Sequence, residues 1–399
     1  MLYNSFQNEK LSALGFGAMR LPLRPDGEID RAELDRMVDA AVAAGVNYFD
    51  TAYAYHGGKS EIALGESLRR YPRESWNLAD KFPGHQNVRG VRPMVPEEVF
   101  EDQLRKCGVE YFDFYLLHNV CENSLAYYYG EKTDECLAYF LEQKAKGRIR
   151  HLGFSSHATA PALERFLDKY GERFEFCQIQ LNFVDWKLQD AEKKVALLRA
   201  HGIPVWVMEP VRGGKLARFE PSIEAKMRAL RPDESTPAWC FRWLRTVPKP
   251  TMILSGMSNL AQMQDNLKTF SGEKPLSGEE LAVLDEAAAS LARMIPCTGC
   301  RYCCAGCPMG LDIPTMLSIA NDMAVSKSFN VVSRYTVLGE GKQAHDCIGC
   351  GQCEMVCPQK IRVPEELRRL AALMETQKTW EEICAERAAI AEAAKKGNA

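Results

Sequence analysis

The sequence lacks a long hydrophobic run, a long basic run and a leader-like start. No apolar stretch approaches the roughly 20 residues that a membrane-spanning helix needs. The first residues, "MLYNSFQNEKLSALG", do not show the basic and then apolar pattern of a secretory signal. The formal net charge is −3, so no electrostatic footprint for nucleic acid is expected. These absences predict a cytoplasmic protein with neither a membrane nor a nucleic acid as its partner.

The sequence also lacks the features that accompany a disulfide scaffold, although it is rich in cysteine. Its 399 residues include 15 cysteines, but disulfide-dense chains are short and secreted. Hydrophobic residues make up 46% and charged residues 26%, which is an ordinary globular balance. The length suits one large domain followed by a smaller one.

A glycine-rich dinucleotide fingerprint is absent as well. The first run that reads as a strand, "VNYFDTA", is followed by "YAYHGG", whereas a doubly wound open sheet carries the fingerprint at this point. Over residues 30–270 helical patterns alternate with short apolar runs, as expected for buried parallel strands. The last run is "PTMILSGMS", and the seventh is the least clear. Eight such units predict an α/β fold, a (β/α)8 TIM barrel, over residues 1–275.

Two cysteine cassettes follow the barrel region. They read "CTGCRYCCAGCP" at residues 297–308 and "CIGCGQCEMVCP" at residues 347–358. Both have the spacing Cys-x2-Cys-x2-Cys-x3-Cys-Pro, which ligates [4Fe–4S] clusters in two-cluster ferredoxins. The repeat continues into "IPTML" and "VPEEL", where a proline marks the first turn of a helix. We therefore expect a linking helix at 276–296 and a mostly α-helical ferredoxin-like domain with a helical tail at 297–399.

In the ferredoxin arrangement the fourth cysteine of each run serves the other cluster. Two four-cysteine sets follow from this rule. The first cluster is expected on Cys297, Cys300, Cys303 and Cys357, and the second on Cys347, Cys350, Cys353 and Cys307. Structural zinc is the alternative, because zinc sites also use Cys-x2-Cys, but zinc does not need the third cysteine and the proline twice over. A shift of register onto Cys304 would break the match between the two runs.

Four polar residues stand at or just after the ends of the apolar runs: Asp50, Tyr55, Lys81 and His118. With "LGFGAMRLP" and "FDTAYAYHGGKSEIALG", these segments resemble the aldo-keto reductase family, the first segment resembling its amino-terminal hairpin. The resemblance implies that the four residues are the catalytic tetrad, at the carboxyl ends of the first three strands. Together with the cassettes, the chain resembles the subgroup that carries a C-terminal domain with two [4Fe–4S] clusters. Tyr53 is the rival of Tyr55 for the acid role.

The chemistry of carbonyl reduction explains these residue types. A hydride must reach carbon and a proton must reach oxygen, and tyrosine, with an unperturbed pKa of about 10, is a poor acid–base group near neutrality. Lys81 is expected to lower the pKa of Tyr55, with Asp50 holding Lys81 in place. His118 would orient the carbonyl oxygen. The predicted activity is nicotinamide-dependent oxidoreduction of a small carbonyl or alcohol, with Tyr55 as general acid and base.

The resemblance also implies where the cofactor binds, with NADP(H) as the first expectation and NAD(H) as the alternative. The nicotinamide would meet the ends of two strands, and "SGMSNLAQMQDN" would hold the adenosine phosphate. The expected contacts are Ser155, Ser156, Gln178, Met208, Arg212, Gly256, Ser258, Gln262, Asp265 and Asn266. Met208 replaces a stacking aromatic residue of many members, and Gln262 replaces an arginine that in some members binds the 2′-phosphate. Arg212 is either a pyrophosphate contact or a solvated loop residue.

A nicotinamide exchanges two electrons and a cluster exchanges one. A flavin usually converts between them, and since the chain shows no flavin motif, a bound flavin stays open. The clusters could pass electrons to or from a ferredoxin or flavoprotein partner, feed single electrons to a substrate in the barrel, or fold the tail. In the alternative function the barrel is not a hydride-transfer site, and the chain performs one-electron reduction of a substrate or partner.

Overall fold

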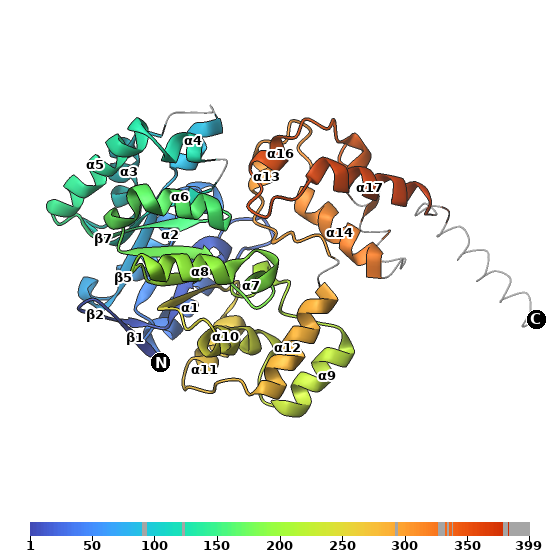
Figure 1. Cartoon of the computed structure of the whole chain (residues 1–399), viewed down its shortest axis with the longest axis horizontal. Coiled ribbons are helices and arrows are strands. Elements are labelled where there is room, and N and C mark those ends of the chain that lie inside the picture. The colour runs from blue at the N-terminus through green and yellow to red at the C-terminus, as the bar shows by residue number, and fades with distance from the viewer. Residues whose placement is uncertain are drawn as a thin grey trace, which may run out of the picture. The chain divides into compact units, whose positions relative to one another are not determined.

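The computed structural model describes residues 1–89, 94–121, 124–291, 294–325, 332, 335–336, 338–377 and 382. By its internal contacts the chain divides into two compact units, Met1–Ser290 and Leu291–Ala399 (Figure 1). Helix α12 (Gly278–Leu291) lies almost wholly in the first unit, although the sequence predicted a linking helix at 276–296. Within the described residues no helix is both long enough and apolar enough to span a bilayer.

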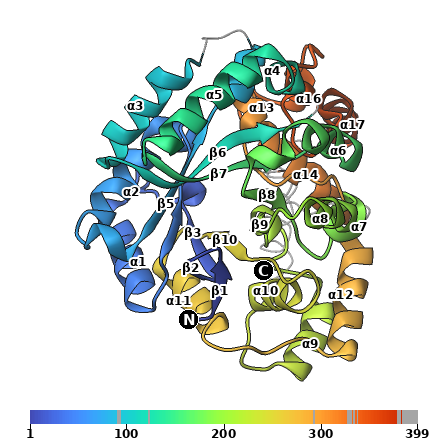
Figure 2. The same ribbon diagram turned by 60° about the vertical axis from the view of Figure 1, so that its left-hand side comes forward.

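Eight parallel strands close into a barrel in the first unit, with helices around it (Figures 1 and 2). The predicted α/β barrel is therefore confirmed. The strands, in their order around the barrel, are β10 (Met252–Gly256), β3 (Leu14–Gly17), β4 (Tyr48–Asp50), β5 (Asn77–Phe82), β6 (Phe112–Val120), β7 (Ile149–Ser156), β8 (Phe176–Gln180) and β9 (Val205–Met208).

The barrel has eight strands, as predicted, but one of the eight is not a segment that the sequence predicted to be a barrel strand. The segment "LGFG", expected in an amino-terminal hairpin, is the first barrel strand, β3, and it pairs in parallel with β10 and β4. The unclear seventh strand between β9 and β10 does not exist, because two helices occupy that part of the chain. β3 was missed because its four residues include two glycines and show no alternation. The hairpin lies earlier, in β1 (Tyr3–Phe6) and β2 (Glu9–Ser12).

The helices of the first unit follow from capping residues and buried stripes. In α1 (Arg31–Ala43), Asp30 accepts a hydrogen bond from the amide of Glu33, and the helix ends before Gly45, which has a φ of 88°. The other helices are α2 (Ser60–Leu68), α3 (Pro96–Cys107), α4 (Leu125–Tyr128), α5 (Glu131–Ala145), α6 (Ala160–Tyr170), α7 (Asp185–Leu188), α8 (Ala191–Ala200), α9 (Pro221–Leu230), α10 (Thr236–Thr246) and α11 (Leu260–Thr269).

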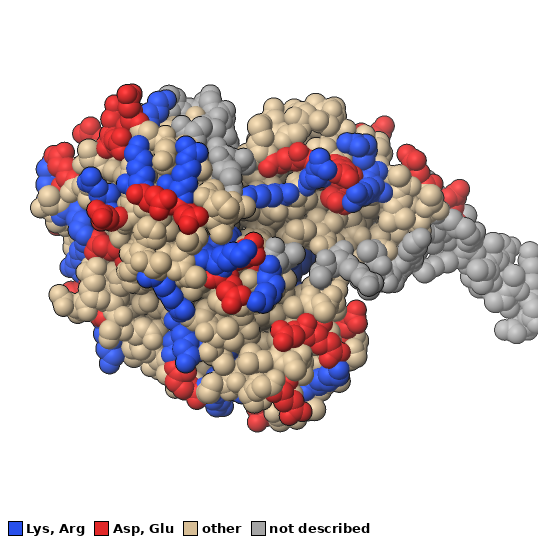
Figure 3. All heavy atoms as spheres, in the orientation of Figure 1, with Lys and Arg blue, Asp and Glu red and all other residues tan. Residues whose placement is uncertain are grey.

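The inside of the barrel is a packed apolar core. Phe6 and Leu11 of the hairpin pack among side chains from the strands, including Trp206, Phe114 and Tyr48. The rings of Phe6 and Trp206 meet edge to face at 4.9 Å. On the surface shown in Figure 3, basic and acidic side chains alternate over the helices of this unit. The packed core leaves the chemistry to the carboxyl ends of the strands.

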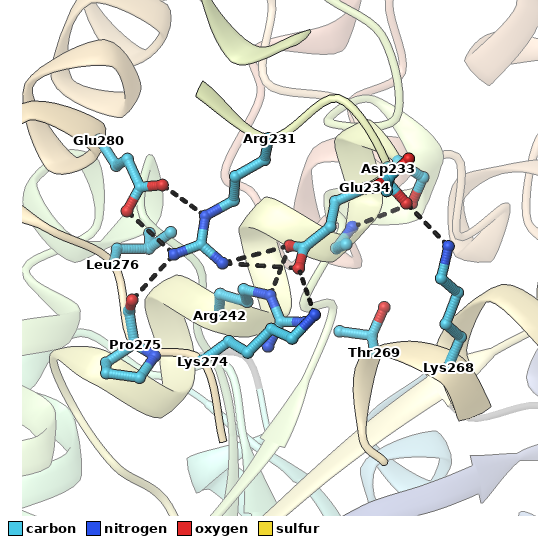
Figure 4. Close-up of polar contacts among 12 residues, drawn as sticks. Arg231, Asp233, Glu234, Arg242, Lys268, Thr269, Lys274, Pro275, Leu276 and Glu280 are labelled. Carbon is cyan, nitrogen blue, oxygen red and sulfur yellow. Dashed lines mark hydrogen bonds and ion pairs between the residues drawn. The ribbon is translucent and has the colours of Figure 1, made fainter. Parts of the chain in front are cut away.

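A mostly buried network of ion pairs fastens helix α12 to the barrel unit (Figure 4). Arg231, which follows α9, contacts Glu280 of α12 through two nitrogens, at 2.5 Å and 3.0 Å. Arg231 is also 3.5 Å from Glu234, which pairs with Arg242 of α10 at 2.5 Å. Lys274 lies 3.7 Å from Glu234. Arg231 therefore joins the loop between α9 and α10 to the first turn of α12.

Replacing Arg231 with methionine should lower the free energy of unfolding by about 2–3 kcal/mol, because two mostly buried carboxylates lose their shared cation. The side chains of Arg231 and Glu280 are 14% and 10% exposed, which places the cost below that of a fully buried pair. Urea unfolding at neutral pH measures this. Arg228→Met, on α9 but 62% exposed, is the matched control and should cost at most about 0.5 kcal/mol. Equal losses in both variants would show that the network contributes nothing.

In the second unit the two cassettes fold as two copies of one motif. Each copy has a short helix and a longer one: α13 (Tyr302–Ala305) and α14 (Ile313–Val325), then α16 (Gln352–Met355) and α17 (Val363–Glu375). The backbone repeats as well, since Gly299 and Gly349 both have a φ of 70°, and Gly310 and Lys360 have 59° and 53°. The mostly helical character is as predicted. The expected tail beyond α17 lies largely outside the described residues.

The core of the second unit is shared by its two halves. Ile313 and Leu317 of α14 and Val363 and Leu367 of α17 belong to one apolar cluster, together with Cys303 and other buried side chains. A short 3-10 helix, η7 (Ala344–Asp346), leads into the second cassette. The cysteine loops are thus held by a core that both copies build together.

Candidate active site and cluster sites

Asp50 and Lys81 form a buried ion pair at the carboxyl end of the barrel. Asp50 is the last residue of β4, and Lys81 lies on β5 beside it. Nζ of Lys81 donates to Oδ1 of Asp50 at 2.5 Å and to the carbonyl oxygen of Thr51 at 2.6 Å. The lysine side chain is fully buried, and these two oxygens hold its ammonium group in place.

Tyr55 begins the short 3-10 helix η2 (Tyr55–Gly58) that follows β4. Its ring centroid is 5.1 Å from Nζ of Lys81, and its ring meets that of His118 edge to face at 6.0 Å. The structure thus brings the four predicted catalytic residues together. Tyr53, the alternative acid, contacts a different residue: Nζ of Lys106 is 4.1 Å from the centroid of its ring.

The expected lowering of the Tyr55 pKa does not occur in this structure. Burial, and then the negative charges of Asp50, Glu209 and Asp80, raise the pKa of Tyr55 well above its usual range. Arg20, rather than Lys81, is the cation that opposes this rise in the pKa of Tyr55. The phenol is therefore protonated at neutral pH, and its raised pKa makes it a weaker acid than a free tyrosine.

His118, on β6, is a neutral imidazole. Burial, followed by the nearby His85 and Lys81, lowers the pKa of His118 well below its usual value. Its Nδ1 is buried without a hydrogen-bond partner. The backbone carbonyl of His118 accepts from the Tyr128 hydroxyl at 3.0 Å and lies 3.0 Å from Nδ1 of His85. No sequence pattern indicated His85, whose only signal is its place just after β5.

Strained backbone gathers at the same end of the barrel. His56, Asn119, Glu209 and Arg212 have φ values of 51°, 63°, 58° and 48°. Such conformations cost roughly 1–3 kcal/mol each and persist where neighbours hold them. Here the Asn119 amide donates to Oγ of Ser155 at 2.9 Å. The loops that follow the strands are therefore built to fixed shapes.

Of the three expected nicotinamide contacts, Gln178 is the best placed. It lies on β8, and its Oε1 is buried without a partner, so it can accept from an amide. Oγ of Ser155 already accepts the Asn119 amide. Oγ of Ser156 donates to the carbonyl of Val120 at 2.9 Å and accepts the amide of Ala158. Ser156 is therefore committed to its own loop, and Met208, at the end of β9, is half-buried.

Arg212 is a buried residue rather than a solvated one. Its Nε is 3.2 Å from Oδ1 of Asp185, which also accepts from Gln180 at 2.7 Å through its other oxygen. Nη2 of Arg212 is buried without a partner, as expected of a donor that awaits an anion. Asp185, Glu209 and Arg20 were not predicted from the sequence. Arg20 lies 3.8 Å from Glu209. Arg20 was missed because β3, just before it, was not recognised as a barrel strand.

The predicted adenosine segment, from Gly256 to Asn266, ends β10 and begins α11. Asp265 accepts the hydroxyl of Ser235 at 2.5 Å, and Nδ2 of Asn266 donates to Ser255. The hydroxyl of Ser258 donates to the carbonyl of Arg20 at 3.0 Å. Gln262 is exposed in the first turn of α11. Most of these side chains are thus bonded to this chain itself.

The second predicted cysteine set lines one small, mostly apolar cavity. Its cysteines come from both cassettes: Cys307, Cys347, Cys350 and Cys353. Thiolates around an apolar space fit an iron–sulfur cluster, and the crossed origin of Cys307 agrees with the ferredoxin rule. Beside this cavity Ile348 is 63% exposed. The second cassette therefore reaches the surface.

In the first predicted set, Cys297, Cys300 and Cys303 lie close enough together for their charges to interact. Cys297 and Cys303 are buried, and Cys300 and Cys357 are half-buried. Cys304, the extra thiol, is half-buried beside Cys303. Among the described side chains, no group of three or more His, Cys, Asp or Glu residues is compact enough to hold a single metal ion.

Comparison with known proteins agrees with both parts of the chain. Residues 13–289 match the profile of the Aldo/keto reductase family, and residues 296–362 match that of the 4Fe-4S dicluster domain. The NADH-specific methylglyoxal reductase of Escherichia coli is 25% identical over 325 residues, covering 71% of this chain and 96% of that protein.

Two solved structures share the fold. The holo form of aldo-keto reductase AKR11C1 from Bacillus halodurans has 24% identity and a TM-score of 0.56, with 72% of this chain and 96% of that chain covered. An aldo/keto reductase from Klebsiella pneumoniae in complex with NADP and acetate has 23% identity and a TM-score of 0.55, with 70% and 92% covered. The chain therefore belongs to the aldo/keto reductase family and carries a 4Fe-4S dicluster domain after its barrel.

Proposed function

We propose that the barrel reduces a small carbonyl compound with a nicotinamide cofactor, and that Tyr55 is the acid. The observation that carries the proposal is the buried group of Asp50, Tyr55, Lys81 and His118 at the carboxyl end of the barrel. Barrel enzymes place their chemistry at this end. When bound, the nicotinamide would supply a hydride, which is two electrons at once.

Each residue has a role that its environment supports. The Tyr55 hydroxyl holds the proton that the carbonyl oxygen receives, because burial keeps the phenol protonated. His118, neutral and with an unpartnered Nδ1, orients the carbonyl oxygen. Asp50 holds Lys81 in place, and the ammonium group of Lys81 packs against the Tyr55 ring. Gln178 and Arg212 would hold the carboxamide and the pyrophosphate through their unpartnered atoms.

For the dicluster domain we propose the crossed ligand sets, with Cys307 serving the second cluster and Cys357 the first. The cavity that Cys307 shares with the second cassette supports this assignment. We also propose that the domain exchanges single electrons with a redox partner protein, a ferredoxin or a flavoprotein. The exposure of Cys350 and Ile348 supports contact with such a partner. The hydride chemistry of the barrel does not itself require it.

Steady-state oxidation of NADH and NADPH by the purified holoprotein tests the proposal. The substrate panel should include dicarbonyl aldehydes, because the relative from Escherichia coli is named a methylglyoxal reductase, and quinones, which accept single electrons. Turnover with aldehydes supports hydride transfer. Turnover with quinones alone would contradict it and favour the one-electron alternative.

A further inference from the structure

We propose that the dinucleotide site takes NADH, the cofactor without a 2′-phosphate, and that Glu33 is the residue that excludes NADPH. This inference rests on the proposed function and on the sequence prediction that the adenosine end of the cofactor lies at the segment beginning with Gly256. It reverses the first expectation from the sequence. The inference starts from side chains of this chain that already accept hydrogen bonds from amides in the first turn of helix α11.

Free amide groups at a helix N-terminus are the usual donors to a phosphate. In α11 two of these amides already have an acceptor. The amide of Leu260 donates to Oε1 of Glu33 at 2.7 Å, and the amide of Gln262 donates to Oδ1 of Asn259 at 2.9 Å. Just before the helix, the amide of Ser258 donates to Oε1 of Gln262 at 2.8 Å. A 2′-phosphate would have to displace these acceptors.

The acceptor on Leu260 is itself an anion. A carboxylate at this position satisfies the positive end of the helix dipole, as a phosphate otherwise would. Glu33 belongs to the first turn of α1, its side chain is 16% exposed, and its other oxygen pairs with Arg36. The carboxylate is thus anchored from both sides. A phosphate brought beside it would face like-charge repulsion in a half-buried place.

No cation in the segment compensates. The stretch from Gly256 to Asn266 contains neither lysine nor arginine. The side chain of Arg20 packs beside Gly256, 3.4 Å from the position that a Cβ on Gly256 would occupy. Its guanidinium, however, faces Glu209 at 3.8 Å. A phosphate is held best by charge-assisted bonds from arginine or lysine. A ribose 2′-hydroxyl is neutral and needs only an acceptor, which a carboxylate supplies.

Fluorescence titration of the holoprotein with NADH and NADPH tests the inference. NADH should bind at least about 10-fold more tightly. Competition with 5′-AMP and adenosine 2′,5′-bisphosphate reads the adenosine end alone and should show the same order. Glu33→Gln keeps an acceptor for the Leu260 amide and removes the charge. Combined with Gln262→Arg, it should raise the affinity for NADPH by about 10- to 100-fold while NADH still binds.

Glu101→Gln is the matched control, because Glu101 is an exposed carboxylate paired with Arg148 and does not touch α11. It should leave both affinities unchanged, and thermal unfolding should show that all the variants fold. Equal or tighter binding of NADPH by the unmodified protein would overturn the inference. So would an unchanged NADH-to-NADPH ratio in the folded double variant. If neither nucleotide binds, the proposed function fails, and this inference fails with it.

Discussion

Replacing Tyr55 with phenylalanine is expected to lower the rate of carbonyl reduction by at least about 10²–10⁴-fold, the range typical of a lost general acid. The ring remains, so its contacts with His118 and Lys81 and the shape of the site are kept. The proton that Tyr55 would donate is lost. The measurement is kcat with an aldehyde at saturating cofactor, with cofactor affinity measured alongside to show that binding survives.

The raised pKa of Tyr55 also predicts how the rate depends on pH. The phenol is the active form in carbonyl reduction, so the rate of that step should stay level from pH 6 to about 9, below the pKa. Alcohol oxidation needs the phenolate, so its rate should rise with pH over the same range. A reduction rate that falls through pH 7–8 would show that a bound cofactor or substrate lowers the pKa of Tyr55.

Tyr53→Phe is the matched control for this prediction. Tyr53 belongs to the same loop after β4, but its ring contacts Lys106 instead of the catalytic group. Its loss should leave carbonyl reduction unchanged. If the Tyr53 variant loses activity and the Tyr55 variant keeps it, the acid has been assigned to the wrong tyrosine.

Replacing Cys350 with alanine should halve the iron content, from about eight to about four atoms per chain. Cys350 lines the cavity shared by the second cysteine set, and three thiolates are left there without it. Its loop is exposed, so the substitution removes little packing. The barrel has its own core and should stay folded. Iron analysis, and absorbance near 400 nm before and after dithionite, measure the change.

Cys304→Ala is the control for the ligand register. Cys304 stands beside Cys303 but is assigned to neither cluster, so its loss should leave all of the iron in place. Iron loss in this variant would mean that the first run binds in a shifted register. Zinc in place of iron in the purified protein would remove the electron-transfer interpretation altogether.

The Cys350 variant also separates the two ways in which the clusters could serve the enzyme. If they exchange electrons only with a partner protein, nicotinamide-dependent carbonyl reduction should survive in Cys350→Ala. We expect this result, because the Tyr55 group is complete within the barrel unit. A variant that folds, binds the cofactor and reduces nothing would show that single electrons reach the substrate through the cluster.

The sequence alone was enough to predict the features that depend on local spacing. The cysteine cassettes repeat at a fixed offset, and both halves fold into a short and a long helix with similar positive φ values at matching positions. The parallel barrel followed from apolar runs that alternate with helices. Asp50, Lys81 and His118 were named through the resemblance to the aldo-keto reductase family, and they lie together because the carboxyl ends of parallel strands meet at one face.

Only the tertiary structure decided what depends on neighbours distant in the chain. β3 is recognisable only through its pairing with β10 and β4, because "LGFG" carries no strand pattern of its own. The direction of the Tyr55 pKa depends on burial and on carboxylates brought near by folding. Glu33 and Leu260 are 227 positions apart, and only the packing of α1 against α11 makes one the cap of the other. The pKa of a group depends on its burial and on nearby charges. A sequence pattern can therefore identify the titratable groups, but only the folded structure determines their electrostatic environment.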